Sequence, residues 1–248
     1  MTFKGQNPHV RDGEPGGRLA ERTLALVNIP SVSRAEAEAM AYVRSELPLG
    51  QRIDVVIDFS MPEGTMNVLP MCVGRRIPLV VATTGHTAEQ RRRIEEAAHD
   101  TALLMAPNMS LVVNVLFELV RRSAEMLAGK DFDVEILEWH HRLKKDSPSG
   151  TALHFARIIQ EAMGQTELRH GREGLVGERP PKEIGMHAIR AGDNVGEHTI
   201  LFSTIGETLA LVHRSSSRDS YARGALEAAK FLAGKPAGRY GMNDVLGL

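Results

Sequence analysis

One stretch in the second half of the chain constrains the fold more than any other, because it changes from a strand pattern to a helical pattern. Apolar and acidic residues alternate from Phe132 to Ile136, as in a strand with one covered face. From Ala152 to Met163 apolar residues recur at helical spacing, and Ser149 is a good N-cap residue. The loop between them holds two histidines and two lysines. This cationic loop therefore ends on the free N–H groups of a helix, which bind anions such as carboxylates.

Each polar residue of this loop also has a simpler interpretation. Adjacent histidines such as His140 and His141 are commonly only solvated, and Lys144-Lys145 is typical of an exposed charge pair. A zinc site is disfavoured, because adjacent histidines lack the i, i+4 spacing of a helical metal pair and no cysteine or third ligand follows nearby. We therefore predict no metal here.

The complete pattern of the loop carries a family resemblance. Residues 138–152 read Glu-Trp-His-His-Arg-Leu-Lys-Lys-Asp-Ser-Pro-Ser-Gly-Thr-Ala. This resembles the signature of the 4-hydroxy-tetrahydrodipicolinate reductase (dihydrodipicolinate reductase) family, Glu-x-His-His-x-x-Lys-x-Asp-x-Pro-Ser-Gly-Thr-Ala, at every fixed position. Leu143 stands where that family has a histidine, and Lys145 and Ser147 replace small apolar residues.

The resemblance implies an NAD(P)H-dependent oxidoreductase of lysine and diaminopimelate biosynthesis that reduces 4-hydroxy-tetrahydrodipicolinate, a cyclic dicarboxylate, to tetrahydrodipicolinate. It places His140 and Lys144 at the proton-donor positions. The positions that bind the substrate carboxylates are His141, Ser149, Gly150 and Thr151. Physical chemistry agrees with these roles, because a dianion needs cations and helix N–H donors. Hydride addition to a conjugated ring also leaves a carbanion-like carbon that a general acid must protonate.

Three apolar runs earlier in the chain predict strands of a parallel sheet. Residues 53–59 are apolar except for Asp54 and Asp58, as in a strand buried on both faces, and residues 78–83 and 103–105 follow. The loops after them could be ordinary turns, but they resemble the family's Asp-Phe-Thr-x-Pro, Gly-Thr-Thr-Gly and Ala-Pro-Asn-(Phe/Met)-Ser segments. Doubly wound sheets bind ligands at such strand ends. The resemblance thus implies that NADH or NADPH is bound by Phe59, Ser60, Ala82, Thr83, Thr84, Ala106, Pro107, Asn108 and Met109.

The expected fold class is α/β, with a Rossmann-like parallel sheet and an inserted α+β domain. Alternating runs at 184–190, 197–203 and 208–214 predict antiparallel strands with one covered face. We expect three parts: an atypical helical segment at 1–50, a dinucleotide-binding domain of 51–109 plus 221–248, and a substrate-binding and oligomerisation domain of 110–220. By resemblance, the three alternating runs build a homo-oligomer, a tetramer.

The first fifty residues do not show the strand, glycine turn and helix with which the family opens, so this β-α-β unit is missing or replaced. Residues 18–47 have helical patterns, and residues 24–33 weakly resemble the start of zinc-dependent desuccinylases and aminoacylases, without their metal ligands. Without a glycine turn for the pyrophosphate, we expect weak NAD(P)H binding and slow reduction. The alternative function is a non-catalytic homologue that keeps the substrate domain but has lost the cofactor phosphate loop.

Composition excludes several other classes of protein. A net charge of −1 and an aromatic content of 4% argue against a nucleic-acid partner. No apolar run reaches the ~20 residues of a spanning helix, and no signal-peptide pattern opens the chain, so no membrane partner is expected. The only cysteine, Cys72, permits no intrachain disulfide, which fits the cytoplasm.

Overall fold

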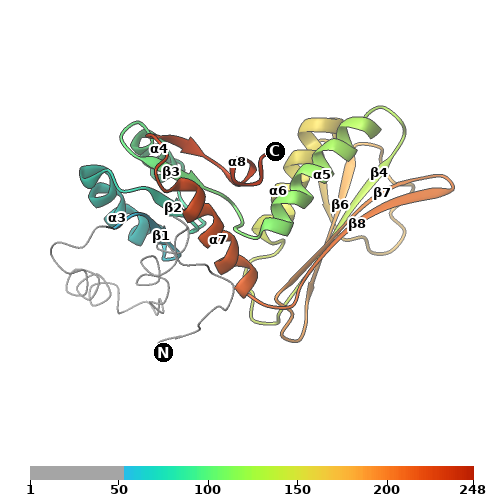
Figure 1. The fold of residues 1–248 in the computed structure, drawn as a ribbon. Coiled ribbons are helices and arrows are strands. Elements are labelled where there is room, and N and C mark those ends of the chain that lie inside the picture. The colour runs from blue at the N-terminus through green and yellow to red at the C-terminus, as the bar shows by residue number, and fades with distance from the viewer. Residues whose placement is uncertain (1–52) are drawn as a thin grey trace, which may run out of the picture. The chain divides into compact units, whose positions relative to one another are not determined.

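A computed structural model describes residues 53–248, which form two compact units (Figure 1). Within the described residues, the first unit contains 53–106 and 225–241, and the second contains 107–224 and 242–248. Two predictions concern residues outside this range: the helices within residues 18–47 and the lack of a glycine turn for the cofactor pyrophosphate. In the part that is described, no helix is long and apolar enough to cross a membrane.

The first unit is built on a parallel four-stranded sheet with the order β1-β2-β3-β9. Its strands are β1 (Val56–Asp58), β2 (Leu79–Val81), β3 (Ala102–Met105) and β9 (Gly238–Tyr240). Every residue of β1 and β2 is buried, as the unbroken apolar runs predict for parallel strands. Helices α3 (Pro62–Arg75) and α4 (Ala88–Ala97) supply buried residues to the same apolar core, among them Leu69 and Ile94.

Local signals set the helices of this unit. Thr87 and Gln90 form a capping box at the start of α4, with bonds of 2.8 and 3.2 Å. Pro70 lies inside α3, which continues through it to Arg75. The ring therefore does not end this helix, whose start is favoured by Pro62 in the first turn.

The second unit contains a mixed five-stranded sheet with the order β5-β6-β4-β7-β8. Its strands are β4 (Asp133–His140), β5 (Glu167–His170), β6 (Glu183–Arg190), β7 (Gly196–Thr204) and β8 (Glu207–Ser215). The three predicted runs are strands, but the expectation that all are antiparallel was wrong for β6, which pairs parallel with β4 and β5. Parallel strands need a long crossover: α6 lies between β4 and β6 in the chain, and a twelve-residue loop, 171–182, connects β5 to β6.

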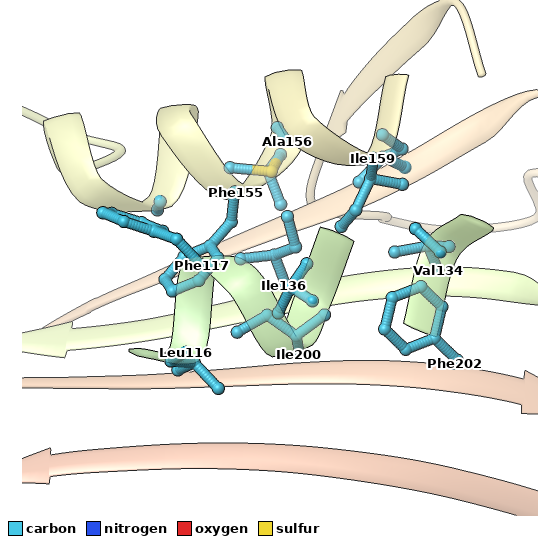
Figure 2. Packing of buried hydrophobic residues seen from close by; sticks show 14 of the residues in the cluster. Leu116, Phe117, Val134, Ile136, Phe155, Ala156, Ile159, Ile200 and Phe202 are labelled. Carbon is cyan, nitrogen blue, oxygen red and sulfur yellow. The ribbon is translucent and has the colours of Figure 1, made fainter. Parts of the chain in front are cut away.

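Helices α5 (Leu111–Leu127) and α6 (Gly150–Met163) supply the apolar residues that pack on one face of this sheet, and α8 (Met242–Leu246) belongs to the same unit. Figure 2 shows Phe117 and Phe155 facing each other beside Ile136; the two phenyl centroids are 4.7 Å apart. Ser110 and Ser149 cap α5 and α6 as predicted, accepting backbone N–H bonds at 3.3 and 3.2 Å. The core thus fixes the end of β4 and the start of α6, between which the cationic loop runs.

Candidate active site

A buried carboxylate, that of Glu138, organises the cationic loop. Alternate residues of a strand share a face, so Glu138 and His140 lie on the same side of β4 as the core residues Val134 and Ile136. Glu138 is only 2% exposed. Burial opposes its ionisation, but hydrogen bonds from His140 and Arg190 prevail and lower its pKa to about 2. Glu138 is therefore a buried anion held by cationic partners.

The imidazole of His140 is fixed by this carboxylate. Its Nδ1 lies 2.5 Å from Glu138 Oε2, and the residue is almost completely buried. The ring of His140 lies next to that of His198, on the adjacent strand β7; the two centroids are 5.3 Å apart in an edge-to-face arrangement. A Cβ placed on Gly196 would come within 3.0 Å of His140 Nε2. The glycine thus leaves room beside the ring nitrogen opposite Glu138.

The loop itself is tied down by its backbone. His141 N–H donates to the carbonyl of Asn194 at 2.8 Å, and Arg142 N–H donates to the carbonyl of Gly192 at 3.0 Å. Lys144 Nζ pairs with Asp146 Oδ1 at 2.8 Å. Burial raises the pKa of Asp146, but the hydrogen bond and charge of Lys144, with smaller contributions that include the charge of Arg190, together leave the pKa lowered. Leu143, which departs from the family pattern, is exposed.

The other predicted substrate residues lie around this loop. Arg218 Nη2 donates to His141 Nε2 at 3.3 Å. The N–H of Ser149 donates to Glu138 Oε1 at 3.0 Å, and its hydroxyl caps α6. Thr151 Oγ1 accepts from Asn108 Nδ2 at 3.1 Å. The structure therefore brings the loop, the start of α6 and Asn108 together. The N–H of Ser149 is already hydrogen-bonded to Glu138 and is not available to a ligand.

Residues to which sequence reasoning gave no role complete the site. Arg190 donates to both oxygens of Glu138, at 2.8 and 2.6 Å. His198 lies opposite Glu138 on β7 and His213 lies opposite His198 on β8, and the two imidazoles stack with centroids 5.9 Å apart. Burial, with His140 and His213 adding to it, lowers the pKa of His198 to about 3. A signal existed for this arrangement, because Glu138 shares a face with Val134 and Ile136, and a buried carboxylate needs a cationic partner.

In the first unit, a second buried carboxylate holds the loop after β1, and hydrogen bonds to backbone carbonyls join this loop to the one after β2. Asp58 accepts from the N–H of Ser60 at 2.9 Å and from the hydroxyls of Ser60 and Thr65 at 2.5 Å each. The Thr83 hydroxyl donates to the Ser60 carbonyl at 3.2 Å, and Ala82 N–H donates to the Asp58 carbonyl at 2.8 Å. His86 Nε2 contacts Thr65 Oγ1 at 3.0 Å.

The remaining predicted cofactor residues are not all part of this network. Phe59 and Thr84 are exposed, whereas Ala106 is buried at the end of β3. Pro107, Asn108 and Met109 belong to the second unit, where Asn108 Oδ1 accepts from the N–H of Ser110 at 2.8 Å. Of the predicted cofactor residues, the network thus joins Ser60, Ala82 and Thr83, at the carboxyl ends of two parallel strands where such sheets bind ligands.

Comparisons with known proteins point to one family. The model "Dihydrodipicolinate reductase, N-terminus" matches residues 27–109, and "Dihydrodipicolinate reductase, C-terminus" matches residues 112–246. The first match begins well before residue 52, where the recognisable motifs begin.

Individual proteins agree with the family models. A 4-hydroxy-tetrahydrodipicolinate reductase of Syntrophus aciditrophicus is 50% identical over 197 residues, 78% of this chain and 73% of that protein. One of Anaeromyxobacter sp. (strain Fw109-5) is 44% identical over 238 residues, 95% and 86% of the two chains. The fold is similar to that of the dipicolinate-bound dihydrodipicolinate reductase from Paenisporosarcina sp. TG-14, with a TM-score of 0.61, 24% identity and coverage of 82% and 75%.

Proposed function

Because this chain belongs to the dihydrodipicolinate reductase family, we propose that the loop of residues 138–152 binds and protonates its substrate. The chain is an NAD(P)H-dependent oxidoreductase of lysine and diaminopimelate biosynthesis, and its substrate is 4-hydroxy-tetrahydrodipicolinate. No observation favours the alternative of a non-catalytic homologue.

The observation that carries the proposal is the convergence of His140, Lys144 and the start of α6 on one loop. The N–H groups of Gly150 and Thr151 lie in the first turn of α6, where backbone donors lack intrahelical partners. With His141 and Lys144 they supply the cations and donors that a dicarboxylate requires. Ser149 contributes to binding by capping the helix that presents these donors. One loop thus holds both the carboxylate donors and the candidate general acids.

The proton that completes the reduction comes from His140 or Lys144. NADH or NADPH, when bound, supplies the hydride that adds to the conjugated ring of the substrate. The addition leaves negative charge on a neighbouring carbon, and a proton from the imidazolium or ammonium group neutralises it. Both candidate proton donors lie within the loop that binds the substrate carboxylates, so one loop positions the general acid and the carboxylate-binding residues.

The cofactor is assigned to the loops at the ends of the parallel strands. The proposed ligands are Phe59, Ser60, Ala82, Thr83, Thr84, Ala106, Pro107, Asn108 and Met109. The hydrogen bond that Asp58 accepts from Ser60 N–H and the one that Thr83 donates to the Ser60 carbonyl support this assignment for the first two loops, because they fix the backbone there. Weak binding of NADH and NADPH remains a prediction, and fluorescence titration with each nucleotide tests it.

We also propose a homotetramer that works in the cytoplasm. Among the described residues 53–248, helices cover only one face of the mixed sheet, and the opposite face carries Trp139, Ile189 and Val212, which are 38%, 46% and 47% exposed. Apolar side chains gathered on an uncovered sheet face are typical of protein interfaces. Light scattering that finds a monomer at micromolar concentration would overturn this proposal.

Calorimetric titration with pyridine-2,6-dicarboxylate tests the substrate loop. Lys144→Ala is expected to weaken binding roughly 10- to 100-fold, since a hydrogen bond to a charged group contributes about 1.5–3 kcal/mol. The matched control is Lys145→Ala, which removes the neighbouring, exposed lysine. Equal affinity in wild type and Lys144→Ala would reject the assignment.

A further inference from the structure

We propose that Glu138 and Arg190 are positioning residues for the reaction: together they hold His140 in one tautomer and tie its ring to the start of α6. The inference rests on the proposed function, in which His140 is a proton donor. Neither residue needs to contact the substrate for this role.

The carboxylate of Glu138 is fully used by the protein. Its Oε1 accepts from Arg190 Nη2 at 2.6 Å and from the N–H of Ser149 at 3.0 Å. Its Oε2 accepts from Arg190 Nη1 at 2.8 Å and contacts His140 Nδ1 at 2.5 Å. A carboxylate has about four acceptor sites, so none is left over. The planar fork of the guanidinium fixes the carboxylate plane, which a lysine ammonium would not do.

This geometry determines where the imidazole carries its protons. An ionised carboxylate only accepts hydrogen bonds, so Nδ1 of His140 must carry the hydrogen that lies between it and Glu138. Nε2 is then the nitrogen that gains and loses the exchangeable proton. Gly196 leaves space beside that nitrogen, because a Cβ there would lie 3.0 Å from it. Glu138 thus places the acidic proton of His140 on the ring nitrogen beside Gly196.

The same carboxylate couples the acid to the carboxylate-binding elements. Through Oε1 it holds the N–H of Ser149, the residue that caps α6. Arg190 Nη2 also donates to the carbonyl of Asp146 at 2.7 Å, in the loop that carries Lys144. A displacement of Glu138 would therefore move the ring, the loop and the helix start together.

A merely structural ion pair would have the same components, and the chain contains one for comparison. Glu135 lies on the same strand, pairs with Arg172 and His187 at 2.7 Å each, and faces the other side of the sheet. Burial opposes its ionisation, but these hydrogen bonds lower its pKa to about 2, as for Glu138. If Glu138 were only structural, removing its charge would affect the enzyme no more than removing that of Glu135.

The test compares Glu138→Gln with Glu135→Gln by histidine nitrogen NMR and steady-state kinetics. A glutamine that keeps the Ser149 bond with its oxygen turns its amide NH₂ towards His140 Nδ1, which moves the ring hydrogen to Nε2. We expect wild type and Glu135→Gln to show the Nδ1–H tautomer of neutral His140, and Glu138→Gln to show the Nε2–H tautomer. We expect kcat to fall roughly 100-fold or more in Glu138→Gln alone.

Further measurements separate this inference from the proposed function. An Nε2–H tautomer in wild type, or an unchanged kcat in a folded Glu138→Gln, overturns the inference. Arg190→Lys keeps the charge but loses the fork, and is expected to lower kcat with little change in dicarboxylate affinity. His140→Gln with full activity would overturn the premise of the inference, the donor role of His140, and would assign that role to Lys144. Loss of activity in His140→Gln together with normal activity in both Glu138→Gln and Arg190→Lys would leave the function standing and refute the positioning role.

Discussion

Acidification should destabilise this protein, and the buried His198, whose pKa is lowered most among the described histidines, should contribute most. His198 is 2% exposed and lies between the imidazoles of His140 and His213. Burial, with these two rings adding to it, lowers its pKa from the ordinary 6.5 to about 3. The unfolded chain therefore binds a proton at this residue near pH 6.5, whereas the folded chain does not until about pH 3. Between these values the unfolded state holds more protons, so the free energy of unfolding falls as the pH falls.

The expected size follows from the shift. Each pKa unit corresponds to about 1.4 kcal/mol, so the complete effect, reached only below pH 3, is about 5 kcal/mol. A pH of 5 lies about 1.5 units below the pKa of this residue in the unfolded chain, so the free energy of unfolding is lower there by roughly 2 kcal/mol. Glu138 does not contribute in this range, because its stabilisation is lost only as the pH falls from about 4.5 towards 2.

Urea denaturation at pH 7.5 and pH 5, at a fixed protein concentration, measures this effect. His198→Gln keeps a polar group near the Ser149 hydroxyl, which lies 3.3 Å from His198 Nε2, but cannot take up a proton. We expect the difference between the two pH values to shrink by roughly 2 kcal/mol in this variant. His99→Gln, at an exposed position, serves as the control and should behave as wild type. An equal pH dependence in wild type and His198→Gln would refute the reasoning.

Three further changes have defined outcomes. Gly224→Ala places a Cβ 1.7 Å from the carbonyl oxygen of Met109, so the free energy of unfolding should fall by about 1–3 kcal/mol or more, seen as a lower melting temperature. Gly74→Ala, in open space on α3, is the control and should be neutral or stabilising. Phe155→Ala should cost about 3–5 kcal/mol in denaturant titrations, because its ring is completely buried. Asp58→Asn should weaken NADH and NADPH in fluorescence titrations and leave the affinity for pyridine-2,6-dicarboxylate unchanged, because Asp58 organises only the loops after β1 and β2.

Elements governed by local interactions could be predicted from the sequence. Thr87, Ser110 and Ser149 each cap a helix by accepting a hydrogen bond from a residue three positions later, so the signal lies within one turn. Strand β5 could not be found, because Glu167–His170 has no apolar period and is a strand only through its pairing with β6. The parallel direction of β6 likewise depends on a helical crossover rather than on its own residues.

The candidate site also contains some residues that a local motif reveals and others that only distant pairing brings in. The loop residues His140, Lys144 and Thr151 could be identified from one contiguous motif. Arg190 and His198 could not, because their partners lie 52 and 49 positions away in the sequence. Period-2 alternation already placed Glu138 on the core face of its strand, and that burial required a cation. Which cation supplied it was a matter of sheet register, which pairs His140 with Arg190 on β6.

The two ion pairs of the site differ in a way that decides which cation can serve the substrate. In the pair of Glu138 and Arg190, the Glu138 side chain is only 1% exposed and that of Arg190 is 18% exposed. Breaking such a buried pair costs about 3–5 kcal/mol, because a buried charge is left unpaired. The pair of Lys144 and Asp146 is different, since the Asp146 side chain is 60% exposed and that of Lys144 is 22% exposed. Exposed pairs contribute only about 0.2–1 kcal/mol. We therefore expect a substrate carboxylate to take Lys144 from Asp146 at small cost but not to take Arg190 from Glu138. The site would then hold one permanent cation for positioning, Arg190 at the end of β6, and one exchangeable cation for binding, Lys144 in the loop.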